Sequence, residues 1–133
     1  MPTGLLDPGE DVGEAAIREL KEETGLDATL ERVLCIRQAH TPDKASDLFF
    51  VCLLKLEDPK QTPVLQEEEI CDLRWMATEE YCNQEAWRES PAYQELNAAI
   101  LRTAREETAG MVERKLPVGF RPGTNTLYIS SII

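Results

Sequence analysis

The sequence predicts an α/β fold in which helices and strands pack as layers around one core. Three observations support this prediction: a helical pattern near the start of the chain, two long strand-like runs after it, and a second helical pattern in the last third. An apolar helix stripe and an apolar sheet face each need another layer to cover them. The length of 133 residues fits a single domain, which we take to extend over residues 1–133.

The first helix is predicted from about Asp11 to Thr24. Three residues on one side of it are apolar: Ala16, Ile17 and Leu20. Gly25 follows the last turn, where glycine commonly adopts the left-handed conformation that ends a helix. The preceding DPGE, residues 7–10, is either the turn before the helix or its cap, with Asp7 as the N-cap residue.

Two strands are predicted next, over Thr29–Gln38 and Asp47–Leu56. The second run is nearly all apolar, which predicts burial on both faces. The alternating segment EICDLRWM, residues 69–76, predicts a third strand. A short helix is expected to follow, with Thr78 as its N-cap residue.

The last third of the chain predicts a longer helix from about Pro91 to Thr108, and Gly110 suits its end. The tail that follows contains turn residues and then a strand-like terminus, LYISSII. Together the C-terminal helix and tail occupy about residues 91–133.

The charge balance restricts the partners of the chain. With 25 acidic and 14 basic residues its formal net charge is −11, so we expect no nucleic-acid partner, because such binding relies on clustered Lys and Arg. No apolar run approaches the roughly 20 residues of a membrane-spanning helix, and we expect no membrane partner. The start of the chain resembles no secretory signal. Four scattered cysteines, expected to be reduced, favour an intracellular, cytoplasmic protein.

Three carboxylates share one stripe of the first predicted helix. Glu19 and Glu23 are four residues apart and Glu19 and Glu22 are three apart, so the side chains project from one face. Neighbouring like charges repel, and Arg18 alone cannot neutralise all three. The residues leave two interpretations open: an acidic face exposed to solvent, or a site for a hard divalent cation such as Mg²⁺ or Mn²⁺, which prefers carboxylate oxygens.

The spacing within residues 4–26 separates these interpretations. The segment fits the pattern G-x5-E-x7-R-E-U-x-E-E-x-G-U, in which U is a bulky apolar residue. This pattern is the Nudix box. The sequence resembles Nudix hydrolases at all nine specified positions, namely Gly4, Glu10, Arg18, Glu19, Leu20, Glu22, Glu23, Gly25 and Leu26. The resemblance favours the cation site over the solvated face.

The resemblance extends beyond the box to about Gln84. Four segments are similar to one branch of the family, which includes plant hydrolases of ADP-ribose and NADH and the animal protein known as the antisense basic fibroblast growth factor product. These segments are PTG (2–4), RQAH (37–40), SDLFFVC (46–52) and WMATEEYCNQ (75–84). The resemblance implies an enzyme that hydrolyses a nucleoside diphosphate linked to another moiety, with ADP-ribose or NADH as the expected substrate.

The resemblance also implies roles for the residues of the box. Glu19, Glu22 and Glu23 would hold Mg²⁺ or Mn²⁺, and Glu22 and Glu23 are expected to be catalytic. Arg18 is expected to join them in catalysis by orienting a carboxylate through pairing within the helix. Gly4 would let the loop backbone approach the helix and the substrate closely, because glycine has no Cβ.

Outside these positions, further residues are candidates for the site. A general base often comes from a separate loop in this family. Glu69, in the acidic run 67–69, is the candidate here, and the alternative is a charged loop without a catalytic role. Arg37 and the loop residue His40 are expected to contact the substrate, and the alternative for both is local hydrogen bonding. Glu10 is expected to be structural, by capping or pairing near the helix start.

The resemblance predicts as well what precedes the box. Nudix domains are α/β/α sandwiches with a mixed sheet whose first strands come before the box, whereas this box begins at residue 4, so we expect N-terminal strands to be missing. An uncovered sheet edge favours self-association, which leaves open a homodimer or a strand borrowed from the chain's own tail. The truncation also keeps a second function open: a catalytically impaired Nudix-like module that binds nucleotides or regulates.

Overall fold

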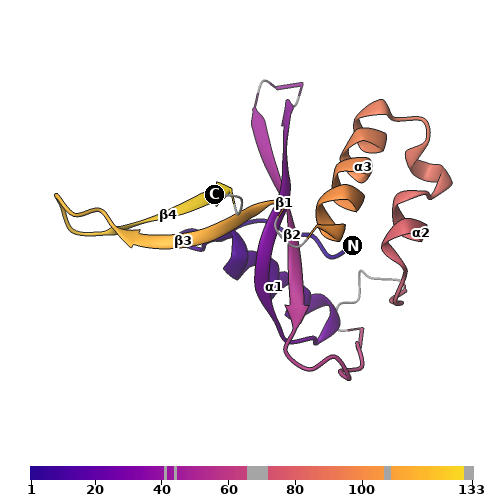
Figure 1. Ribbon diagram of the computed structural model, residues 1–133, viewed down its shortest axis with the longest axis horizontal. Helices are drawn as coiled ribbons and strands as arrows, with labels where there is room; N and C mark the ends of the chain where they lie inside the picture. The colour runs from indigo at the N-terminus through magenta and orange to yellow at the C-terminus, as the bar shows by residue number, and fades with distance from the viewer. Residues whose placement is uncertain (41, 44, 66–71, 107–108, 131–133) are drawn as a thin grey trace. The chain divides into compact units, whose positions relative to one another are not determined.

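The computed structural model describes residues 1–133 except 41, 44, 66–71, 107–108 and 131–133 (Figure 1). The described chain contains both helices and strands, which is an α/β arrangement. Their bounds are α1 Val12–Thr24, β1 Ala28–His40, β2 Ser46–Leu56, α2 Thr78–Cys82, the 3₁₀ helix η1 Glu85–Trp87, α3 Pro91–Arg105, β3 Met111–Pro117 and β4 Thr124–Ser130. Within these ranges no helix is both long enough and apolar enough to cross a membrane.

The first predicted helix is confirmed as α1, and its two ends have separate causes. Asp11 is the N-cap residue, and its backbone N–H donates to the Glu14 carboxylate at 2.9 Å as part of a capping box. Gly25 ends the helix with a left-handed φ of 74°. The alternative with Asp7 as the N-cap is wrong, because the Glu10 N–H donates to the Asp7 carbonyl at 3.1 Å and closes a turn before the helix.

The four strands form one antiparallel sheet in the order β2-β1-β3-β4. β1 meets β3 at Val33↔Met111, and β3 pairs with β4 from Met111↔Ser130 to Pro117↔Thr124. The α/β prediction is confirmed, but the expected mixed sheet is wrong for these strands. Only residues 41–45 separate β1 from β2 and 118–123 separate β3 from β4. Links this short join antiparallel neighbours, whereas parallel neighbours need a crossover of about a dozen residues or more.

The individual strand predictions succeed in part. β1, β2 and the terminal strand β4 are confirmed, and β3 was not predicted. β2 is not buried on both faces: Val51 is buried, but Leu48 is 59% exposed. β2 is also an end strand with one neighbour in the described sheet. Of the third predicted strand, residues 69–71 lie outside the described residues, and residues 72–76 are not in a strand.

The two predicted C-terminal helices are present with shifted ends. α2 begins at Thr78, but its N-cap residue is Ala77. α3 begins after Ser90, whose side chain accepts from the Tyr93 N–H at 3.3 Å, and it ends at Arg105, earlier than predicted.

A buried arginine explains where α3 stops. Arg32 on β1 is 4% exposed, and its Nη2 donates to three carbonyls at the end of α3. These are the carbonyls of Thr103 at 3.3 Å, Ala104 at 3.4 Å and Glu106 at 3.0 Å. The prediction that Gly110 ends this helix is wrong. Gly110 has φ of 102° just before β3, and a Cβ there would overlap the Val33 carbonyl.

The chain divides into two compact units. Unit 1 contains residues 1–31 and 52–75, and unit 2 contains residues 32–51 and 76–133. Each unit has buried apolar residues of its own. In unit 1 these include Val12, Ala15, Leu26 and Ala28, and in unit 2 they include Val33, Leu34, Val51, Cys82 and Ile100. Residues 4–26, which match the Nudix pattern, lie wholly within unit 1.

Candidate metal-dependent active site

Arg18 on α1 is the centre of an ionic network in unit 1. Its Nε and Nη2 donate to the two carboxylate oxygens of Glu10 at 2.7 and 2.9 Å, which makes a bidentate pair. Its Nη1 donates to Glu19 at 2.8 Å and to Glu22 at 3.2 Å. Nη2 also donates to the Leu5 carbonyl at 2.9 Å. One guanidinium group therefore joins the loop before α1 to two carboxylates of the helix.

This network shifts the pKa values of its members. Hydrogen bonds from Arg18, with a smaller contribution from the Asp7 backbone N–H, lower the pKa of Glu10 from 4.5 to about 2. Hydrogen bonds to Glu10 and then Glu19 raise the pKa of the Arg18 guanidinium above its ordinary value. The Asp7 carboxylate adds a further negative charge 3.4 Å from the Arg18 Nε. Glu10 is therefore ionised across the whole neutral and mildly acidic pH range.

Gly4 brings the loop backbone against the helix. A Cβ added at Gly4 would overlap the carboxylate group of Glu19, so any larger residue on this path would require the Glu19 side chain to move. A hydrogen bond from Arg18 to the carbonyl of the next residue, Leu5, also holds the loop against the helix. The close approach expected from the sequence is present, and a role of Gly4 in substrate binding stays a prediction.

The three carboxylates on α1 have different surroundings. The side chain of Glu19 is 17% exposed and that of Glu22 is 48% exposed, while Glu23 is partly buried one turn after Glu19. Among the described residues, no group of three or more His, Cys, Asp or Glu side chains has a metal-binding arrangement. The donor type nevertheless fits Mg²⁺ or Mn²⁺, because all three offer hard carboxylate oxygens on one helix. Their roles as metal ligands and catalytic groups stay predictions.

The other predicted site residues lie elsewhere in the chain. Glu69, the expected general base, lies outside the described residues. His40 belongs to unit 2 and is the last residue of β1, so its predicted place in a loop is wrong: β1 continues past the predicted end at Gln38. The His40 Nδ1 lies 3.2 Å from the Ser46 hydroxyl on β2, which is a local hydrogen bond.

Arg37, also in unit 2, is held between two aromatic rings. Its guanidinium carbon lies 4.8 Å from the centroid of Phe49 and 5.5 Å from that of Tyr93, within cation–π range. Its Nη1 donates to the Tyr93 hydroxyl at 3.1 Å, and the Trp87 ring lies 5.1 Å beyond Tyr93. Its Nε has no hydrogen-bond partner among the described residues. The guanidinium is therefore fixed by packing and retains a donor that its local contacts do not use.

Two contributors to the Arg18 network were not predicted. Leu5 contributes a backbone carbonyl, which no sequence pattern marks. Asp7 was interpreted only as a turn or cap residue, although its place in DPGE, three residues before Glu10, was a signal that both carboxylates would face the same cation. The pairing expected for Glu10 near the helix start is confirmed, as is the pairing of Arg18 with a carboxylate of its own helix.

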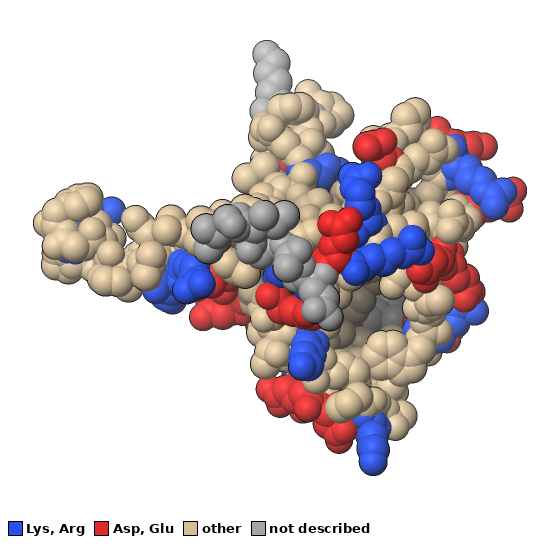
Figure 2. Space-filling model, in the orientation of Figure 1, with Lys and Arg blue, Asp and Glu red and all other residues tan. Residues whose placement is uncertain are grey.

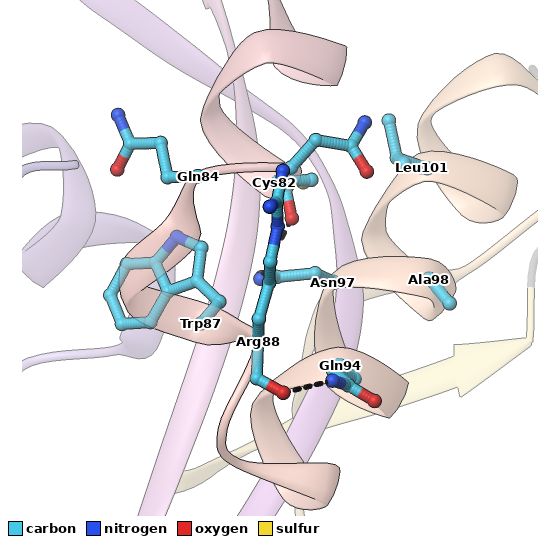
Figure 3. A pocket seen from close by; sticks show the side chains of 9 residues that line it. Cys82, Gln84, Trp87, Arg88, Gln94, Asn97, Ala98 and Leu101 are labelled. Atoms are coloured by element: carbon cyan, nitrogen blue, oxygen red, sulfur yellow. Dashed lines mark hydrogen bonds between the residues drawn. The ribbon is translucent and has the colours of Figure 1, made fainter.

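A separate hollow of about 270 Å³ lies in unit 2 between α2, η1 and α3 (Figure 3). Its lining includes four amide side chains, and the amide nitrogen of each donates within the protein. Asn83 donates to the Glu79 carbonyl, Gln84 to the Met76 sulfur, Gln94 to the Arg88 carbonyl and Asn97 to the Cys82 carbonyl. Burial raises the pKa of the Cys82 thiol. Because these donors are used internally, we interpret the hollow as part of the helix packing.

The loop with Gly4, the turn with Glu10 and the helix with Arg18 and its glutamates are the parts of a folded Nudix box, which defines a class of metal-dependent hydrolase sites. The family model described as the NUDIX domain matches residues 1–96. The chain therefore belongs to the Nudix family. Members of this family are generally pyrophosphatases and typically depend on a divalent metal.

Similar proteins come from plants and animals. Nudix hydrolase 2 of Arabidopsis thaliana is 46% identical over 85 residues, which cover 62% of this chain and 30% of that protein. Nudix hydrolase 10 of the same plant is 31% identical over 132 residues, which cover 98% of this chain and 47% of that protein. The Homo sapiens protein Nucleoside diphosphate-linked moiety X motif 6 is 47% identical over 57 residues, which cover 41% of this chain and 18% of that protein. The predicted branch is confirmed, and the chain spans less than half the length of each of these relatives.

Proposed function

We propose that the chain hydrolyses a nucleoside diphosphate linked to another moiety, with ADP-ribose or NADH as substrate, in the presence of Mg²⁺ or Mn²⁺. The observation that carries the proposal is the Arg18 network, in which one guanidinium contacts Glu19 and Glu22 within a complete Nudix box. The family match supports the reaction class. The oxygen of water attacks one phosphorus, a P–O bond of the diphosphate breaks, and AMP leaves with a phosphorylated remainder.

Each residue of the box has a proposed part in this reaction. Glu19, Glu22 and Glu23 would hold the divalent cation, which when bound neutralises charge on the diphosphate and acidifies the attacking water. Arg18 positions the Glu19 and Glu22 carboxylates through its hydrogen bonds. Gly4 keeps the space beside the Glu19 carboxylate free of a side chain.

Residues beyond the box complete the proposal. Glu69 is the proposed general base, which accepts the proton of the attacking water. Arg37 is a proposed contact for a substrate phosphate, because it carries a positive charge on a guanidinium that Phe49 and Tyr93 hold in place. His40 is a proposed substrate contact as well, in competition with its bond to Ser46.

The test measures AMP release from ADP-ribose and from NADH by the 133-residue chain with added Mg²⁺ or Mn²⁺. We expect the unchanged chain to release AMP, and Glu22→Gln or Glu23→Gln to abolish release, because each amide removes a negative charge from the cation site. Glu95→Gln is the matched control, since Glu95 is an exposed glutamate on α3 outside the box. Equal loss of activity in Glu95→Gln, or full activity in Glu23→Gln, would contradict the assignment.

A second candidate is a nucleotide-binding module without catalysis. It is favoured by one observation: the Arg18 Nη1 donates to both Glu19 and Glu22, so two of the three carboxylates proposed for the cation already have a positively charged partner. In that case ADP-ribose raises the melting temperature of the chain, but no AMP is released with either metal. Measuring both quantities on the same sample separates the two functions.

A further inference from the structure

A loop from later in the chain, residues 57–64, contacts the end of α1. The Val64 backbone N–H donates to the Thr24 carbonyl at 2.8 Å, and Thr24 is the last residue of the helix. The last carbonyls of a helix have no partner within it, so the loop supplies a donor that the helix lacks. Thr24 and Leu26 are both buried at this junction. The 57–64 loop therefore caps the C-terminal end of α1.

Gln61 fixes the 57–64 loop to the segment between α1 and β1. Its Oε1 accepts from the Asp27 N–H at 2.8 Å, and its Nε2 donates to the Asp27 carbonyl at 2.9 Å. One side-chain amide therefore bonds both backbone groups of one residue, as a paired antiparallel strand does. The Nε2 also donates to the Asp58 carbonyl at 3.0 Å, and the Gln61 N–H donates to the same carbonyl at 3.2 Å. Because Gln61 lies 34 residues after Asp27, this contact joins segments that are distant in the sequence.

The junction held by Gln61 directly follows two of the carboxylates proposed for the cation. Glu22 and Glu23 precede Thr24 in the last turn of α1. The ends of helices fray, and side chains on a frayed turn have no fixed direction. The contacts from the 57–64 loop oppose this fraying, so they hold the turn that carries both carboxylates.

Fixed direction matters more at this site than negative charge does. Acidic side chains occur at several places on the face of the molecule in Figure 2, so charge alone does not distinguish a cation site from the rest of the surface. Mg²⁺ requires ligands in near-ideal octahedral geometry. Outer residues that orient the ligands commonly change metal affinity about 10–100-fold when they are replaced. A residue that fixes the end of α1 should therefore change the affinity for the cation.

We propose that Gln61 is a positioning residue for the cation site on α1. The role rests on the proposed function, because it concerns the same site. Gln61 acts through the backbone, where its bonds to Asp27 and Asp58 fix the loop. The fixed loop presents the Val64 N–H to Thr24, and the last turn of α1 keeps its shape. An amide suits this role because it offers a donor and an acceptor at one end, whereas a carboxylate only accepts.

The first test measures Mn²⁺ binding to the full chain without substrate, by isothermal titration calorimetry. Gln61→Met keeps the approximate length of the side chain but removes the amide donor and acceptor. We expect its dissociation constant for Mn²⁺ to be about 10–100-fold higher than that of the unchanged chain. Gln94→Met is the matched control, because Gln94 also donates to a backbone carbonyl, that of Arg88, but in unit 2. It should bind Mn²⁺ as the unchanged chain does, and circular dichroism verifies that every variant is folded.

Gln61→Glu separates position from charge. The new carboxylate still accepts from the Asp27 N–H, but it cannot donate to the carbonyls of Asp27 and Asp58. If negative charge governed the affinity, this variant would bind Mn²⁺ more tightly than the unchanged chain. We expect weaker binding, because the loop loses its anchor. Equal or tighter binding would overturn the proposal.

Amide hydrogen exchange, followed by nuclear magnetic resonance, tests the path from Gln61 to the helix. In Gln61→Met the N–H groups of Asp27 and Val64 should exchange at least about 10-fold faster than in the unchanged chain. The Ala15 N–H, which donates to the Asp11 carbonyl at the other end of α1, should exchange at an unchanged rate. Unchanged exchange at Val64 would contradict the proposed path.

These measurements separate the role of Gln61 from the proposed function. If the unchanged chain binds Mn²⁺ and Gln61→Met binds it equally well, Gln61 is not a positioning residue, while the proposed cation site stands. Equal weakening in Gln94→Met would also overturn the role of Gln61, because it would indicate a general loosening of the fold. If the unchanged chain binds no Mn²⁺, the proposed function fails, and the positioning role fails with it.

Discussion

Arg18 and Arg32 both organise a helix, but in contrasting surroundings. Arg18 in unit 1 has a side chain that is 26% exposed, and it bonds mainly to carboxylates. Arg32 in unit 2 is 4% exposed and bonds to backbone carbonyls at the end of α3. The partners of Arg18 lie at most 13 residues away in the chain, whereas those of Arg32 lie at least 71 residues away. One arginine organises a local segment, and the other joins distant ones.

The different surroundings of Arg18 and Arg32 suit different roles: Arg18 positions carboxylate groups, and Arg32 stabilises the fold. Ion pairs that water still reaches contribute less to stability than buried contacts, because water screens them and the side chains lose freedom. The Arg18 network therefore serves chiefly to orient carboxylates, which suits a site that must exchange ions and substrate. A buried arginine is different: when it is removed, the carbonyls it satisfied at the helix end lose their donor in a place that water reaches poorly.

The largest expected effect on stability follows from removing Arg32. Arg32→Leu deletes the donor for the carbonyls of Thr103, Ala104 and Glu106, and we expect the free energy of unfolding to fall by about 2–4 kcal/mol. Urea unfolding followed by circular dichroism measures this change. Arg102→Leu is the control, because Arg102 is exposed near the end of the same helix. It should cost less than about 0.5 kcal/mol, and similar losses in the two variants would show that the buried contacts are unimportant.

The same contrast explains what could be predicted from the sequence. The Arg18 network was largely predictable, because its members fall at fixed spacings in one helix and the adjoining turn. Arg32 was not, because nothing near it in the chain marks a residue that caps a helix 71 or more positions later. Gly110 was misread for a related reason: its left-handed conformation serves a close approach to Val33, not a helix end. The general base was predicted at Glu69, which lies outside the described residues.

Replacing Arg18 by lysine tests its role in positioning, because the expected effect is on activity more than on stability. The Arg18→Lys variant would have a single ammonium group, which cannot bond both oxygens of Glu10 and also reach Glu19 and Glu22, so the carboxylates lose their orientation. In this variant we expect kcat/KM for AMP release to fall about 10–100-fold, with a smaller loss of stability than in Arg32→Leu. Arg105→Lys is the control, since Arg105 pairs with Glu79 at 2.7 Å outside the box. If Arg18→Lys lost much stability but kept its activity, Arg18 would have the stabilising role that is assigned here to Arg32.

The smallest expected effect is a dependence on pH that the Arg18 network should show and the Arg32 contacts should not. Hydrogen bonding from Arg18 holds the pKa of Glu10 at about 2 in the folded chain, below its ordinary 4.5. A carboxyl whose pKa is lowered by folding stabilises the folded state above its unfolded pKa, and this contribution is lost as the pH falls toward the folded pKa. The difference in melting temperature between the unchanged chain and Glu10→Gln should therefore be constant from about pH 7 to about pH 5 and shrink as the pH falls further toward about 2.

Other carboxyls do not obscure this measurement. The pKa of Glu79 is also lowered, by its hydrogen bond with Arg105, but that effect is present in both chains and cancels in the difference. The corresponding difference for Arg32→Leu provides the contrast, because the carbonyls that Arg32 binds do not titrate and its contribution should persist in acid. If the Glu10→Gln difference stayed constant down to about pH 3 while that of Arg32→Leu shrank, the bond between Arg18 and Glu10 would not be the ionic contact that organises the start of the box.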